Sequence, residues 1–236
     1  SSAEIIGGFE YQGNDLVSYE INIINCNSYG EINLKADNFI TNIYYSTFYK
    51  SIHLNAAFEI VGNIFSTNSA YSDTLFIENA NWNLGGNLSS NKIKVFANRF
   101  ENYQFKCHIS ANSLINKIHV ANNYMTSSIA GSTALLHLNG STTDCLIENN
   151  SLVDFNSSAG QNTYSGDILK SDQGLFMLNL RNNLILSNSF GQSSSYLFNF
   201  NGGRNTIFKL ENNYFNYTPF SVSQAVSNTY ARYIHM

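Results

Sequence analysis

Short stretches in which apolar and polar residues alternate recur along most of the chain. A period of two residues is typical of a β-strand that buries one face. We therefore predict a first strand in each stretch. The stretches are EINIINC (20–26), SIHLNA (51–56), LFIENA (75–80), KCHISA (106–111), LLHLNG (135–140), LKSDQG (169–174) and LFNFNG (197–202).

A second phrase recurs in step with these stretches. It consists of an apolar residue, a spacer, a small residue or asparagine pair, another spacer and a large apolar residue. Its copies start 25 to 35 residues apart, and a constant phrase with variable spacing indicates a fixed structural unit joined by loops of different length. The copies are LKADNF (34–39), IVGNIF (60–65), VFANRF (95–100), VANNYM (120–125), IENNSL (147–152), LRNNLI (180–185) and LENNYF (210–215).

We interpret the centre of this phrase as a corner between two strands. A sharp corner needs positive φ, which asparagine tolerates better than other non-glycine residues. Corners stacked about 4.8 Å apart would let asparagine side chains hydrogen-bond along the stack. The corner positions are Asp37, Asn63, Asn98, Asn123, Asn150, Asn183 and Asn213. The inward apolar positions that follow are Phe39, Phe65, Phe100, Met125, Leu152, Ile185 and Phe215.

Each repeat thus holds a first strand, a turn, a second strand, the asparagine corner, a third strand and a longer loop. This pattern resembles the right-handed parallel β-helix of the pectate-lyase-like superfamily, over roughly residues 16–217. The resemblance implies an all-β solenoid of about seven to eight three-strand coils with asparagine ladders at the turns. It implies the fold and not the activity, since the superfamily includes polysaccharide lyases, glycoside hydrolases, phage tailspikes and non-catalytic surface proteins.

No linker divides the chain, so we expect a single domain over residues 1–236, with residues 1–15 and 218–236 as partial coils or caps. The open ends of a solenoid are edge strands, which invite pairing with neighbouring domains or subunits. The chain begins at Ser1 and shows no charged-then-apolar leader. We therefore expect a processed product or a fragment of a longer protein.

Composition narrows the classes of function. Charged residues make up 12% of the chain and aromatic residues 14%, which argues against disorder. The net charge of −4 gives no basic footprint for nucleic acid. No apolar run approaches the roughly 18 residues of a membrane span. The three cysteines, Cys26, Cys107 and Cys145, are too few and too far apart for a disulfide framework or a CxxC metal site, so we expect small core residues.

Possible chemistry concentrates on the outward positions of the first strands. When the predicted first strands are aligned with one another, His108, His137 and Lys170 are expected on consecutive coils, about 5 Å apart. One predicted column is Asn22, His53, Phe76, His108, His137, Lys170 and Asn199. The next is Ile24, Asn55, Glu78, Ser110, Asn139, Asp172 and Asn201.

In the pectate-lyase-like superfamily this face and its flanking loops usually hold the ligand groove. The resemblance therefore implies a polysaccharide or glycan partner. Crowded cationic groups lower each other's pKa. A neutral Lys170, His137 or His108 could then act as general base on the C5 proton of a uronate.

The remaining candidates would bind the substrate. Asp172 or Glu78 could orient the base or hold a cation, and calcium is the possible cofactor. Arg204 could pair bidentately with a substrate carboxylate, and Trp82 could stack on a sugar ring. Asn139 and Asn199 complete the set of candidate substrate-binding residues. A zinc site at His108 and His137 lacks a third ligand.

We therefore expect a secreted or cell-surface protein, bacterial or phage-associated, that binds and could cleave an acidic polysaccharide. A lyase fits better than a glycoside hydrolase, because no closely spaced aspartate pair is present, but the acidic trio of calcium-dependent pectate lyases is missing too. The alternative is a non-catalytic structural or adhesive β-helix, such as a surface stalk, a tailspike shaft or part of a larger assembly. The low charge and the lack of a recognisable catalytic set favour this alternative. Ice binding would need a regular threonine-rich face, which is absent.

Overall fold

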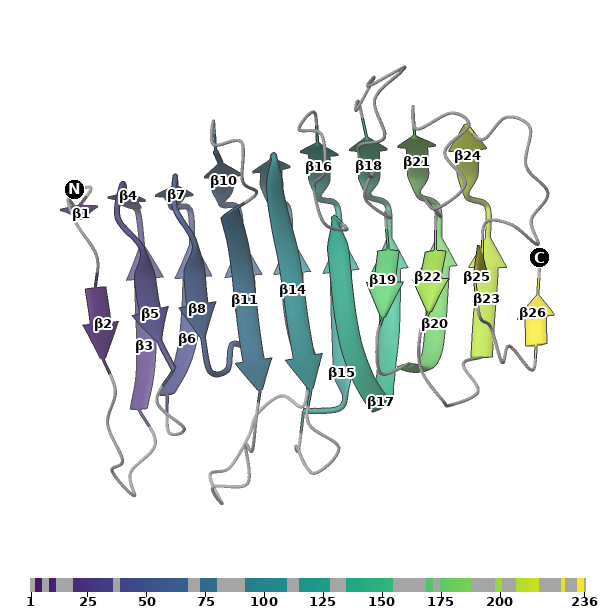
Figure 1. The fold of residues 1–236 in the computed structure, drawn as a ribbon, viewed down its shortest axis with the longest axis horizontal. Coiled ribbons are helices and arrows are strands. Elements are labelled where there is room, and N and C mark those ends of the chain that lie inside the picture. The colour runs from purple at the N-terminus through teal and green to yellow at the C-terminus, as the bar shows by residue number, and fades with distance from the viewer. Residues whose placement is uncertain are drawn as a thin grey trace.

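The described residues form strands and turns, and no helix occurs among them. Every described strand pair is parallel. The strands succeed one another along the long axis of the molecule (Figure 1). The computed structural model describes residues 3–5, 9–11, 19–35, 39–67, 73–79, 92–109, 115–127, 135–154, 169–171, 175–187, 198–200, 207–216, 226–227 and 233–235.

The strands follow three parallel ladders, which we call sheets A, B and C. Sheet A contains β1 (Ala3–Ile5), β4 (Cys26–Ser28), β7 (Thr47–Phe48), β10 (Ile64–Ser66), β13 (Arg99–Glu101), β16 (Tyr124–Ser127), β18 (Ser151–Asp154), β21 (Leu184–Ser187) and β24 (Tyr214–Asn216).

Sheets B and C are joined because one long strand, β17 (Leu136–Glu148), contributes its first part to sheet B and its last part to sheet C. Sheet B also contains β2 (Phe9–Tyr11), β5 (Ile32–Leu34), β8 (Ile52–Leu54), β11 (Asp73–Asn79), β14 (Tyr103–Ile109), β19 (Leu169–Ser171), β22 (Phe198–Phe200) and β25 (Val226–Ser227). Sheet C also contains β3 (Tyr19–Ile24), β6 (Phe39–Tyr44), β9 (Glu59–Val61), β12 (Lys92–Phe96), β15 (Lys117–Ala121), β20 (Leu175–Arg181), β23 (Ile207–Glu211) and β26 (Tyr233–His235).

The chain passes through sheets B, C and A in that order, and we call one such passage a coil. Neighbouring strands of a sheet therefore belong to successive coils. Parallel pairing with a long connection between the partners is what a β-solenoid requires. The predicted all-β class is confirmed, and the parallel sheets are compatible with a parallel β-helix.

Asparagine side chains link successive coils at the junction between sheets C and A. The Nδ2 group of Asn98 donates to Oδ1 of Asn123 at 3.0 Å, and the Asn98 backbone N–H donates to the same oxygen at 2.9 Å. These amides are buried, so they satisfy backbone groups that the corner would otherwise leave unpaired. The same pair of bonds joins Asn63 to Asn98, Asn123 to Asn150, Asn150 to Asn183 and Asn183 to Asn213.

The positive φ angle of the corner belongs to the residue before each of these asparagines. It is 71° at Gly62, 55° at Ala97 and 55° at Asn149. The expectation that the hydrogen-bonding asparagine itself takes this conformation is therefore wrong. Two adjacent residues therefore form the corner. The first takes the positive φ that turns the backbone, and the second hydrogen-bonds the backbone groups at the turn.

One predicted corner was assigned to the wrong junction. In the phrase at 34–39, Leu34 ends β5 in sheet B and Phe39 begins β6 in sheet C, while Asp37 lies outside the described residues. The C-to-A corner of this part of the chain lies instead at Tyr45, where φ is 52°. Ser46 follows it, and its backbone N–H donates to Oδ1 of Asn63 at 2.9 Å.

A file of apolar side chains runs along the inner face of sheet A. Phe65 and Phe100 are fully buried, and their ring centroids lie 4.6 Å apart in a stacked arrangement. Phe48, rather than the predicted Phe39, precedes Phe65 in this file. Among the cysteines, Cys107 and Cys145 are free and buried as expected, whereas Cys26 is half-buried. Burial raises the pKa of both buried thiols. The remaining members of the inner file are Met125, Leu152, Ile185 and Phe215.

Replacing Phe100 by alanine should lower the free energy of unfolding by about 3–5 kcal/mol, because it empties a fully buried position between stacked neighbours. Denaturant unfolding followed by far-ultraviolet circular dichroism measures the change. Leu184→Ala, on the outer face of the same sheet and 40% exposed, is the matched control and should cost much less. Equal losses in the two variants would contradict this assignment of the inner face.

Replacing Asn150 by valine should lower the free energy of unfolding by about 3 kcal/mol, because several buried partners lose their hydrogen bonds at about 1–3 kcal/mol each. The Asn150 side chain donates to the carbonyl groups of Val120 and Glu148 and accepts from Asn123. The same unfolding experiment on Asn149→Gly is the control, since glycine keeps the positive φ. A larger loss for Asn149→Gly than for Asn150→Val would reverse the division of tasks at the corner.

Candidate functional site on sheet B

Two files of outward-facing residues follow sheet B. The first joins His53 to Phe76, Phe76 to Lys106, Lys106 to His137, and His137 to Lys170 in register. Asn33 precedes this first file and Asn199 continues it. The second file holds Glu78, His108 and Asn139.

His108 does not occupy its predicted position. It pairs with Glu78 and Asn139, and Lys106 takes the place beside His137. The predicted file of His108, His137 and Lys170 is therefore wrong for His108, although His137 and Lys170 are adjacent. The physical reason is that the buried side chains of Phe105 and Cys107 set the register of β14, two residues away from an alignment based on its histidine.

Other predicted positions are also changed or lie outside the description. Asn22 and Ile24 belong to β3 in sheet C, where they pair with Asn42 and Tyr44, so their assignment to the first-strand face is wrong. Among the candidate substrate-binding residues, Trp82, Asp172 and Arg204 lie outside the described residues, as do Ser110 and Asn201.

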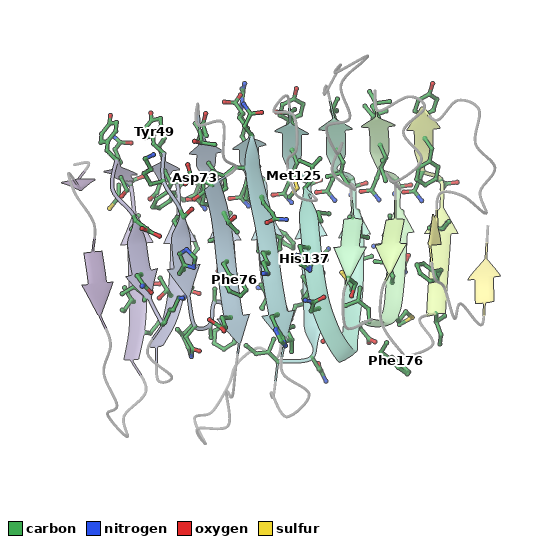
Figure 2. The ribbon with its side chains drawn as sticks, in the orientation of Figure 1. Tyr49, Asp73, Phe76, Met125, His137 and Phe176 are labelled. Carbon is green, nitrogen blue, oxygen red and sulfur yellow. The ribbon has the colours of Figure 1, made fainter. Side chains whose placement is uncertain are left out.

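The middle of the site is largely covered. His137 is only 9% exposed and Asn139 only 6%. The Asn139 Nδ2 atom lies 3.5 Å from Nε2 of His137, and the Ser171 hydroxyl donates to Asn139 Oδ1 at 3.3 Å. The second file thus supports the first file by polar contacts. Phe76 and His137 both lie within the central part of the sheet (Figure 2).

The N-terminal part of the first file combines an aromatic ring with charge. The Lys106 ammonium lies 4.7 Å from the centroid of the Phe76 ring, a cation–π contact. His53 approaches the same ring edge-on at 6.0 Å. Burial and then the nearby Lys35 lower the pKa of His53, and Glu31 at 3.5 Å opposes this only in part. His53 is therefore neutral at pH 7, and Lys106 is the cation at this part of the file.

The described residues contain no group of three or more histidine, cysteine, aspartate or glutamate side chains that could hold a metal ion. Of the two residues predicted to hold a cation, only Glu78 lies within the described residues, so calcium binding stays a prediction. Within the same ranges, no helix has the length and apolar character needed to cross a membrane.

A set of charged side chains on the outer face of sheet C was missed by the sequence interpretation. Glu59 accepts hydrogen bonds from Lys94 at 2.7 Å and from the Tyr44 hydroxyl at 2.9 Å. The bond from Lys94, then that from Tyr44, lowers the pKa of Glu59. Burial and then the bond to Glu59 raise the pKa of Tyr44 to about 12. Counting four residues back from ladder residues Asn63 and Asn98 would have located Glu59 and Lys94 on one file.

A second cluster on sheet C joins three coils. Glu148 accepts from the Arg181 Nε–H at 2.5 Å and lies 2.6 Å from Nε2 of His119. The bond from Arg181 lowers the pKa of Glu148, and His119 adds to this effect while burial opposes it. Because the Glu148 carboxylate can only accept, the neutral His119 ring carries its proton on Nε2 and donates it to Glu148.

Protonation of His119 is disfavoured by its surroundings. Its Nδ1 atom is buried without a hydrogen-bond partner, and the Phe96 ring meets it edge-on at 4.6 Å. Burial lowers the pKa of His119, Lys92 and Arg181 act in the same direction, and Glu148 opposes them. This cluster therefore joins three coils through Glu148, with the second ring nitrogen of His119 buried.

Comparison with known proteins does not extend this picture: no protein-family profile, curated protein or solved structure matches the chain. Membership of the pectate-lyase-like superfamily therefore stays a prediction, and the site is interpreted from its own geometry.

Acidification should lower the melting temperature in two steps. The first begins below pH about 6.5, because the unfolded chain then protonates His119 and His53 more readily than the folded chain, in which burial lowers the pKa of both side chains. The second follows below the ordinary glutamate value of 4.5, because Glu148 and Glu59 have lowered pKa values and lose their ion pairs on protonation. Thermal unfolding measured across this pH range tests both steps.

The first step should shrink in His119→Phe, even though this variant loses the bond to Glu148 and is less stable at neutral pH. Lys117→Gln, an exposed change on the same strand, is the control and should keep the first step. An unchanged first step in His119→Phe would show that another group causes it.

Proposed function

We propose that this protein is a right-handed parallel β-helix of the pectate-lyase-like kind and that the outer face of its sheet B binds an acidic polysaccharide. Such polymers lie outside cells, so we place the protein at the cell surface or in the secreted fraction. The proposal covers binding first, and cleavage is not needed for it.

The observation that carries the proposal is the register of three basic residues on neighbouring strands. Lys106 pairs with His137, and His137 pairs with Lys170, so the three backbone positions follow one another at about 4.8 Å. The two lysines lie on the strands on either side of the histidine. This spacing favours a ligand with repeated negative charge. A uronic-acid polymer has such charge on successive sugar units.

Neighbouring groups support a sugar rather than a simple anion. The Phe76 ring is half-buried beneath the Lys106 ammonium, so it offers an apolar surface next to the charge. Glu78 and His108 flank the first file and can hydrogen-bond hydroxyl groups. This mixture of one ring, cations and polar side chains matches a ligand that has C–H faces, hydroxyls and carboxylates.

Binding is better supported than lyase chemistry. A general base must reach the proton that it removes, yet His137 is mostly covered and Asn139 lies beside it. His108 lies in the second file and not in the first file, where a base was expected. Lys170 keeps its register position and remains the candidate base if the protein cleaves its ligand.

Replacing Lys106 and Lys170 together by glutamine should weaken binding to polygalacturonate or alginate by about tenfold or more at low salt, because two charges next to the polymer are removed. Isothermal titration calorimetry at two ionic strengths measures the change, and wild-type affinity should fall as salt rises. Lys209→Gln is the control, because it removes an exposed lysine on sheet C, where Lys209 pairs with Asn179.

The outcomes separate the two classes of function. Ultraviolet absorbance of unsaturated uronates in the same samples would show lyase activity in addition to binding. This absorbance should then vanish in the double variant, which lacks Lys170. A protein that binds no polyuronate, or whose double variant binds as well as Lys209→Gln, contradicts the proposal and favours the structural or adhesive alternative.

A further inference from the structure

The outer face of sheet A presents apolar side chains to solvent in a single file. Ile64, Tyr124, Leu184 and Tyr214 are between 39% and 61% exposed. Exposed apolar groups gathered in one place mark an interaction surface more often than single ones do. From β10 to β24 the file, in register order, is Ile64, Arg99, Tyr124, Ser151, Leu184 and Tyr214.

A tyrosine pair extends this face toward the N-terminal coils. Tyr29 and Tyr49 directly follow β4 and β7, and both rings are exposed. Their centroids lie 4.8 Å apart with the ring planes at 8°. The Tyr49 backbone N–H donates to the carbonyl of Ser28 at 3.0 Å, which fixes the pair at the end of the sheet. Tyr49 lies at the upper edge of the molecule (Figure 2).

From β10 to β24 the described outward residues of this face carry no net charge, because Arg99 in this file is balanced by Glu101 in the outward file beside it. Arg99 forms an ion pair with Glu101 two positions along the strand, so the two charges cancel. The Arg99 guanidinium also lies 5.7 Å from the centroid of the Tyr124 ring. The faces of sheets B and C, in contrast, carry lysine, histidine and glutamate side chains at their centres. A partner selected by sheet A is therefore uncharged.

The face is also regular. Pairing continues without a register shift from β7 through β24, whereas sheet C has a shift between Gly140 and Asp144. Six positions at about 4.8 Å make a straight file about 24 Å long. A straight and repetitive surface suits an extended polymer that repeats along its own length.

We propose that the outer face of sheet A is a second binding site, specific for an uncharged polysaccharide. Tyrosine offers a ring face to sugar C–H groups and a hydroxyl to sugar hydroxyls. Arg99 and Ser151 stand between the apolar positions and add hydrogen-bond donors. A protein partner would favour an unbroken apolar centre, which this file does not have.

The proposal goes beyond the function of sheet B and does not depend on it. Two faces with different chemistry would let one protein hold a charged and an uncharged polymer at once. The two sites can be lost independently, because their residues lie on different sheets of the solenoid.

Affinity gel electrophoresis with hydroxyethyl cellulose, galactomannan and dextran tests the second site. We expect at least one of these neutral polymers to retard the protein, and the double variant Tyr124→Ala with Tyr214→Ala to bind it about tenfold more weakly. Phe176→Ala is the matched control, because Phe176 is 52% exposed but lies on β20 in sheet C. Retardation should persist at high salt and in the Lys106 and Lys170 variant.

Three results would overturn the proposal. The first is the absence of retardation by all three polymers. The second is equal retardation of the double variant and the Phe176 control. The third is an oligomer in sedimentation velocity that becomes a monomer in the double variant, which would assign this face to a second copy of the chain. Each result leaves the sheet B proposal standing, since that site is tested with polyuronates.

Discussion

The structure depends on how a parallel solenoid satisfies its backbone at each corner. Where the chain leaves sheet C for sheet A, it turns sharply, and amide and carbonyl groups at the turn lose their partners in the strands. A buried asparagine such as Asn123 replaces them, because its side chain accepts from one coil and donates to another. The residue before it supplies the left-handed backbone. This arrangement holds successive coils in register where sheet C passes into sheet A.

Fixing the register inside leaves the outer positions open to different chemistry. The inner faces share apolar residues such as Phe100, Val95 and Leu138, whereas the outer faces differ. Sheet B carries basic residues and a phenylalanine, sheet C carries ion pairs that join coils, and sheet A carries exposed tyrosines. The ion pairs on sheet C connect residues of successive coils. They therefore contribute to the joining of coils, and sheets A and B offer the accessible binding chemistry.

The sequence predicted the fold class well because its signals are local and repeated. The phrases ending in Phe65, Phe100 and Met125 mark their corners correctly, since the same three-dimensional unit recurs with the same residues. Register across coils was harder to predict. The predicted register of His108 was wrong by two residues. The buried side chains of Phe105 and Cys107 set the register, and a histidine has no preference between the two outward positions.

The sheet C clusters escaped notice for a related reason. His119, Glu148 and Arg181 are far apart in the chain, and only stacking brings them together. The number of residues between each of these side chains and its corner asparagine would have placed them together. This distance can be used only when the corner is known to set the register. Trp82 and Arg204 fall between the repeated phrases of the sequence and outside the described residues, so they have no such reference point.

The repeating corner also bears on how such a chain can change in length. Each buried asparagine bonds within its own coil or to the coils next to it, and most of its neighbours present the same groups. An internal duplication or deletion of one whole coil would therefore leave every other junction intact. Evolution can lengthen or shorten the molecule in steps of one turn, and each step adds or removes one rung from every outer face together.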